Sequence, residues 1–222
     1  MSKISVTTIA GLTSGGDANK VKIESGDTLQ VDSNATVGGT LGVTGETTLT
    51  GGAKVNTIKH TGGTSALTID STGRILTPAR PMFDVAKSST QSISSGTPTK
   101  VTWDTENYDI GGNFASDKFT APIAGKYHMN ALLTLSTIIA GAGIGLIWYK
   151  NGSVFRSGHH QSTEINITFG ISSSVIFDLA ASDYIEVYVF QGSGSAETVG
   201  TANNVGSVNA VGSNYWSGYL IG

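Results

Sequence analysis

The clearest structural signal in the chain lies in residues 100–135, which read KVTWDTENYDIGGNFASDKFTAPIAGKYHMNALLTL. The last part of this stretch places apolar residues at every second position, which is typical of a strand with one buried face. Turn signals precede it at Gly111–Gly112 and at Pro122 with Gly125. The stretch therefore predicts tight turns followed by a strand whose buried positions are Tyr127, Met129, Ala131, Leu133 and Leu135.

The same alternation continues to the end of the chain. The further apolar runs are Ile165, Ile167, Phe169 and Ile171; Val175, Phe177 and Leu179; Ile185, Val187 and Val189; and a last strand over Tyr215–Ile221. Turn residues separate them at Asn151–Gly152 and Ser182–Asp183. We find no helical period longer than a turn. Many short strands without helices predict an antiparallel β-sandwich.

Residues 100–135 resemble the opening of the complement C1q-type globular head, one of the tumour necrosis factor-like jelly rolls. The matching positions are Val101, Trp103, Tyr108–Asp109, Gly112, Phe114, Phe119, Ala121–Pro122, Gly125 and Tyr127. Three later segments resemble the family's central strand and turn, a strand step and the closing strand: WYKNGS (148–153), FDLAASDYIEVYV (177–189) and SNYWSGYLIG (213–222). The resemblance, which starts near Phe83, implies a jelly-roll knob over residues 84–222. It also implies a homotrimer, with apolar sheet faces packed around a three-fold axis.

The first 80 residues have a different character, because all 17 aromatic residues lie from Phe83 onward. A segment without aromatics lacks the side chains that bury the most area in a globular core. Instead, aliphatic residues recur every six positions, in a column made of Val31, Val37, Val43, Leu49 and Val55. This period predicts a fibrous β-repeat stalk over residues 29–80 that needs partner copies to cover its apolar side. The repeats resemble the stalks of phage tail fibres, which also trimerise.

The chain thus divides into three expected parts. Residues 1–28 are interpreted as a segment that anchors the protein to a virion, residues 29–80 as the stalk, and residues 84–222 as the knob. Pro78 and Pro81 stiffen the junction, so we place the boundary at about 80–84. The expected fold class is all-β: an N-terminal β-repeat stalk followed by a C-terminal jelly-roll β-sandwich, as a homotrimer.

Composition excludes several classes of function. A net charge of −3 leaves no basic excess for binding nucleic acid. The longest nearly continuous apolar run, residues 138–149, is too short to insert into a membrane. The chain has no cysteine, no collagen-like Gly-X-Y repeat and no secretion signal. These features distinguish it from secreted animal members of the family and favour a viral or bacterial fibre assembled in the cytoplasm.

Few residues suggest catalysis. Asp104, Glu106 and Asp109 form a carboxylate cluster, but we interpret it as a solvated turn between strands rather than a glycosidase pair. His159 and His160 are adjacent in sequence, so in a strand they would point to opposite faces and could bind a metal only as copies around a three-fold axis. We expect no enzymatic activity and no cofactor, and the metal question stays open.

Two polar stretches are candidate receptor-contact loops, because loops on a rigid sandwich commonly carry binding sites. They are Arg156–Glu164 and residues 191–213, and the candidate contacts are Arg156, His159, His160, Gln161, Glu197, Asn203 and Asn204. Trp103, Trp148 and Trp216 could stack on sugars, but each lies in a family-like strand, so we expect packing instead.

These observations predict a trimeric bacteriophage tail fibre or adhesin, a structural virion protein that acts outside the cell. Its knob would bind a host-surface glycan or protein, and its N-terminus would bind another virion protein of the tail or capsid. The alternative is a capsid decoration or head-fibre protein with the same trimeric knob. The sequence does not identify the receptor or the host.

Overall fold

The computed structural model describes residues 31, 35–48, 53–162, 167–200, 203–205, 208–210 and 214–222, and these contain strands but no helix. The chain divides into two compact units, residues 1–53 and 54–222. The expected boundary at 80–84 falls inside the second unit, and the expected anchoring segment 1–28 lies outside the described residues. In the described part of the chain, no helix is present that is long and apolar enough to cross a membrane.

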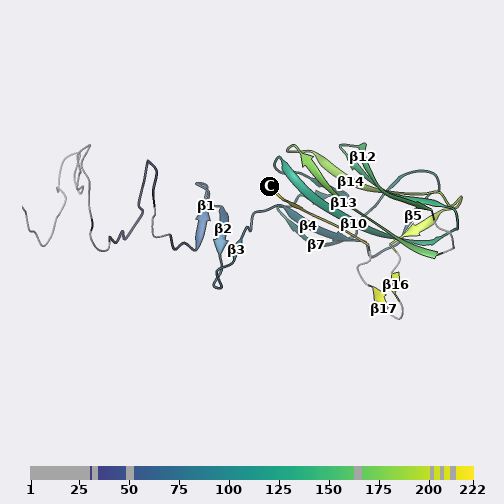
Figure 1. The fold of residues 1–222 in the computed structure, drawn as a ribbon, viewed down its shortest axis with the longest axis horizontal. Coiled ribbons are helices and arrows are strands. Elements are labelled where there is room, and N and C mark those ends of the chain that lie inside the picture. Colours follow the sequence, from purple (N-terminus) through teal and green to yellow (C-terminus); the bar gives the residue numbers. More distant parts are fainter. Residues whose placement is uncertain are drawn as a thin grey trace, which may run out of the picture. The chain divides into compact units, whose positions relative to one another are not determined.

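A small antiparallel sheet precedes the knob (Figure 1). It consists of β1 (Thr57–Lys59), β2 (Ser65–Ile69) and β3 (Ile75–Leu76). The turn between β2 and β3 is held by Asp70, whose Oδ1 accepts the backbone N–H groups of Thr72 and Arg74 at 2.9 Å each. The bond from the Arg74 N–H, followed by the Thr72 hydroxyl, lowers the pKa of Asp70 to about 2. The chain here therefore forms a strand, a turn and a second short strand.

Two larger antiparallel sheets form the knob (Figure 1). The seven-stranded sheet has the order β5 (Gln91–Ile93), β15 (Glu197–Val199), β10 (Gly125–Ile138), β18 (Tyr215–Leu220), β4 (Met82–Ala86) and β7 (Thr105–Ile110), with β13 (Ile167–Leu179) also paired to β10. The six-stranded sheet has the order β12 (Ser153–Ser162), β11 (Gly143–Lys150), β14 (Tyr184–Gln191), β9 (Lys118–Thr120) and β8 (Phe114–Ala115), with β6 (Thr99–Lys100) also paired to β14. A separate hairpin joins β16 (Asn203–Val205) to β17 (Val208–Ala210).

The strand order identifies the knob as a jelly roll. Neighbouring strands are rarely consecutive in the chain: β18 lies between β10 and β4, and β14 lies between β11 and β9. Such crossings between two antiparallel sheets are the Greek-key connections of a jelly roll. The described structure therefore confirms the predicted jelly-roll sandwich.

Large aromatic side chains join the two sheets. Phe83 of β4 stacks on Phe119 of β9 with ring centroids 4.8 Å apart, and Trp216 of β18 lies 6.1 Å from Trp148 of β11. These four side chains are fully buried, which confirms the expected packing role of Trp148 and Trp216. Aromatic residues bury large areas and their edge-to-face pairs add further stability, so this cluster is the main source of cohesion between the sheets.

Two local expectations were wrong. The runs ending at Ile171 and starting at Val175 belong to one continuous strand, β13, because β10 pairs with it from Leu179 back to Ile167. Serines interrupt the apolar alternation there without interrupting the backbone pairing. The Arg156–Glu164 stretch is strand β12 up to Ser162 rather than a loop, because β11 pairs with it along its length.

Candidate functional site

The outer face of the seven-stranded sheet carries an unusual row of residues. Five side chains lie side by side across five strands in register: Ile176 (β13), His128 (β10), Tyr219 (β18), Met82 (β4) and Ile110 (β7). We call these five residues the open row. The outer face of a sandwich sheet is ordinarily polar, so a row of mainly apolar residues across the whole sheet is a candidate contact surface.

Exposure supports this interpretation. Ile176 is 57% exposed, Tyr219 44% and Ile110 37%. By contrast, Phe177, which follows Ile176 in β13, and Phe83, which follows Met82 in β4, are fully buried. Met82 and His128 are half-buried. Ile176, Tyr219 and Ile110 are therefore the parts of the row that are open to solvent.

Short hydrogen bonds order the surface around the row. Nε2 of His128 lies 2.8 Å from the hydroxyl oxygen of Ser174, and its ring lies 5.4 Å from that of Tyr219. In the next row, the Ser217 hydroxyl donates to Oδ1 of Asn130 at 2.9 Å. The face therefore offers an apolar row beside a row of small polar groups that are already ordered.

Exposed apolar side chains also occur along the segment before the knob. Val31, Val37, Val43 and Val55 of the six-residue column are all exposed, while Leu49 lies outside the described residues. Leu41, which is not a member of this column, is 70% exposed. Such aliphatic side chains stabilise a fold or an assembly only when another part of the protein or a partner removes them from water.

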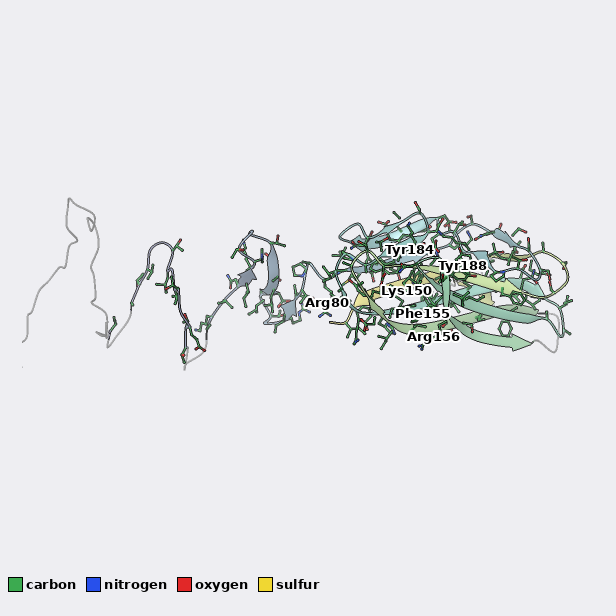
Figure 2. All side chains as sticks on the ribbon, turned by 90° about the horizontal axis from the view of Figure 1, so that it is seen from above. Arg80, Lys150, Phe155, Arg156, Tyr184 and Tyr188 are labelled. Atoms are coloured by element: carbon green, nitrogen blue, oxygen red, sulfur yellow. The ribbon has the colours of Figure 1, made fainter. Side chains whose placement is uncertain are left out.

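The predicted receptor contacts lie on separate elements. Arg156, His159, His160 and Gln161 lie on β12, an edge strand of the six-stranded sheet. Arg156 is exposed, and its guanidinium carbon lies 5.5 Å from the ring of Phe155 (Figure 2). Glu197 begins β15 in the other sheet and accepts hydrogen bonds from Ser193 and Ser195, and Asn203 and Asn204 lie on β16.

Strands β12, β15 and β16 belong to three different sheets, and the binding role of these residues stays a prediction. The side chains of His159 and His160 lie outside the described ones, so the question of a metal at these histidines is untouched. In the part of the chain that the structure describes, no three His, Asp or Glu side chains form a metal-ligand cluster.

The carboxylates of the expected turn have separate roles. Asp104 precedes β7 and accepts hydrogen bonds from the backbone N–H groups of Ser88 and Ser89, at 2.7 and 3.0 Å, and from both serine hydroxyls. Burial alone would raise the pKa of Asp104, but the hydrogen bonds from Ser89 and Ser88 outweigh it and hold the pKa well below its usual range. Asp104 is therefore a clamp that is ionised at neutral pH, unsuited to act as a general acid.

Glu106 and Asp109 lie in strand β7, which corrects the expected loop. This segment pairs with β4 and is therefore the edge strand of the seven-stranded sheet. Asp109 accepts the N–H of Phe114 at 2.8 Å, which fixes the turn after β7. Glu106 is exposed.

The sequence reasoning missed the open row. A signal was present: in the run Val175-Ile176-Phe177, an apolar residue stands at the position where the alternation expects a polar one. That excess identifies an outward-facing apolar residue only once the buried face of the strand is known.

Comparison with known proteins gives matches only among solved structures. No family model matches the chain, and no curated protein matches it. The globular domain of zebrafish complement 1qA protein is 17% identical, with a TM-score of 0.43, and the match covers 64% of this chain and 98% of that one. Murine APRIL at pH 8.5 is 12% identical, with a TM-score of 0.43 and coverage of 64% and 99%. Eiger TNF from S. frugiperda is 11% identical, with a TM-score of 0.45 and coverage of 64% and 92%. These are heads of the two kinds that residues 100–135 resemble.

Proposed function

We propose that this chain is a homotrimeric viral fibre protein, namely a bacteriophage tail fibre or adhesin whose knob binds the host cell surface without covalent chemistry. The stalk would hold the three chains together, and residues 1–28 would attach them to another virion protein.

The open row is the observation that carries the proposal. Fully burying a side chain such as Ile or Met contributes roughly 1.5–3 kcal/mol. Ile176 and Tyr219 are only about half exposed, so each would contribute roughly half of that on being covered. Copies of the same row around a three-fold axis would cover one another, and the ordered polar row beside it would set their register.

The exposed aliphatic column supports the same assembly independently. One chain alone cannot cover Val37, Val43 and the other column members, whereas neighbouring copies of the same repeat can. Two separate parts of the chain therefore each favour association with copies of itself. The resemblance of the repeats to tail-fibre stalks supports a location on a virion.

The assembly is tested by light scattering on the full chain. A monomer has a mass of 22.8 kDa, and the expected species has three times that mass. Ile176→Asp places three charges in the proposed interface and should shift the species towards the monomer. Ile123→Asp is the matched control, because Ile123 is also about half exposed but lies outside the open row. A monomeric wild type, or equal effects of the two variants, would contradict the trimer.

The location of the protein on the virion is tested separately by immunogold electron microscopy of the virus that carries this chain, with antibody against residues 84–222. Gold on the tail or its fibres is expected. Gold spread over the capsid would instead identify a decoration protein, and particles without gold would refute a virion role.

A further inference from the structure

A hollow of about 380 Å³ opens at one edge of the knob. It lies where β7, the last strand of the seven-stranded sheet, meets the β8–β9 hairpin of the other sheet. Edge strand β12, with the predicted contacts Arg156 to Gln161, lies at the opposite end of its sheet from β8. The hollow is therefore distinct from the polar stretches that the sequence singled out.

Aromatic side chains form part of its wall. Trp103 and Phe114 line the hollow and are half-buried, whereas Trp148 and Trp216 are fully buried. The backbone N–H of Trp103 donates to Oδ1 of Asp117 at 2.7 Å, so the tryptophan is fixed in place. Of the three tryptophans, Trp103 alone presents part of its ring to the hollow.

One polar atom of this tryptophan lacks a partner. Nε1 of Trp103 is buried and forms no hydrogen bond within the described residues. A buried indole N–H without an acceptor is costly, and such groups in native proteins call for a specific explanation. Because Nε1 has almost no exposed surface, the part of Trp103 that a ligand could contact is its ring and not this atom.

Acceptor groups on the rim remain available. Glu106 and Oδ2 of Asp117 form no hydrogen bond among the described residues. Asp104 also lines the hollow, but its oxygens are occupied by Ser88 and Ser89. The hollow therefore offers carboxylate acceptors above an aromatic wall.

A buried lysine moderates the charge of the site. The side chain of Lys87 is only 1% exposed, and its Nζ lies 3.8 Å from Oδ2 of Asp104. Its charge also interacts with Asp117. One lysine does not balance the three carboxylates Asp104, Glu106 and Asp117, so the hollow keeps a net negative charge and repels anionic ligands.

We propose that this hollow is a subsite for a neutral pyranose sugar. The apolar face of a sugar ring would stack on Trp103, and its hydroxyls would donate to Glu106 and Asp117. The volume lies within the range of small-molecule sites. The inference rests on the proposed host-surface adhesion and names the ligand class for it, and three hollows per trimer would give avidity to weak single sites.

The test is saturation-transfer NMR on the full chain, with methyl glycosides of glucose, galactose, mannose, rhamnose and N-acetylglucosamine at millimolar concentration. At least one glycoside should bind. Glu106→Ala should weaken binding by about tenfold or more, because it removes a charged acceptor from an exposed position. Trp103→Phe should also weaken it, since the stacking surface shrinks. Asp178→Ala is the matched control, because Asp178 is an exposed carboxylate that does not line the hollow, and it should leave binding unchanged.

Several outcomes would overturn the subsite. Binding of none of the glycosides would do so, as would binding that Glu106→Ala leaves intact. Binding of cadaverine but of no sugar would make the hollow a cation site instead. The trimer mass and the immunogold location are measured without any sugar, so failure of the subsite and failure of the proposed function are distinguishable.

Discussion

Asp104→Ala should lower the stability of the knob far more than an exposed carboxylate would. The carboxylate accepts two backbone N–H groups, from Ser88 and Ser89, and each such bond is worth about 1 kcal/mol. Its attraction to the Lys87 ammonium at 3.8 Å is about 4 kcal/mol at an effective dielectric constant of 20. Because the Asp104 side chain is 30% exposed, solvent screens this attraction, and we count about a quarter of it. The expected loss is about 3 kcal/mol.

The assay is urea unfolding at fixed protein concentration, followed by tryptophan fluorescence. Asp178→Ala is the matched control, because Asp178 pairs with Lys126 at 3.1 Å while both side chains are mostly exposed. Such pairs contribute about 0–1 kcal/mol. In a thermal scan, the Asp104 variant should melt roughly 6–12 °C lower than the wild type.

The pH dependence gives a second readout of the same clamp. Hydrogen bonds from Ser89 and Ser88 outweigh the opposing effect of burial and depress the pKa of Asp104 in the folded chain from its ordinary 3.8. A depressed carboxyl pKa stabilises the fold above the unfolded value, and this stabilisation is lost as the pH falls through the folded value. The gap between wild type and Asp104→Ala should therefore be constant above about pH 5 and shrink below about pH 4. A gap under 1 kcal/mol at pH 7, or one that does not change with acid, would refute the clamp.

Three further predictions concern packing and charge. Gly158→Val should prevent the knob from folding, seen as loss of soluble protein, because a Cβ there would lie 2.6 Å from Cβ of Ser173 and 3.0 Å from a backbone oxygen. Ser173→Ala should cost about 1–3 kcal/mol in urea unfolding, since the Nε1–H of Trp148 now donates to that hydroxyl at 2.9 Å and would lose its partner. Asp183, whose pKa is lowered to about 2 chiefly by the hydrogen bond from Lys150, should stabilise the fold above its ordinary pKa; in acid titrations of stability, Asp183→Asn should converge with the wild type as the pH falls towards 2.

The strands of the knob could be predicted because their buried faces alternate regularly. Tyr127, Met129, Ala131, Leu133 and Leu135 are all buried on β10, as the period of two requires. The continuity of β13 could not be predicted, because backbone pairing with β10 carries the strand through a polar run that side-chain patterns report as a break.

The candidate sites were less predictable than the fold. The sequence placed Asp104 and Glu106 in one carboxylate cluster and treated Trp103 separately, but only the meeting of β7 with the β8–β9 hairpin places all three around one hollow. Whether a tryptophan is buried or half-exposed depends on which strands lie above it. For the same reason, sequence spacing could not distinguish Trp103 from Trp216.

The open edge of strand β13 affects how readily the chain aggregates. Along its length β13 pairs with β10, and among the described strands it has no second partner, so it presents unpaired backbone groups over thirteen residues. Such an edge is a template for strand addition by other nascent chains. Gly170 and the serines at 172–174 interrupt its apolar pattern, and an edge strand without a continuous apolar run is less prone to aggregate. The serine run that obscured this strand in the sequence therefore lowers the aggregation tendency of its open edge.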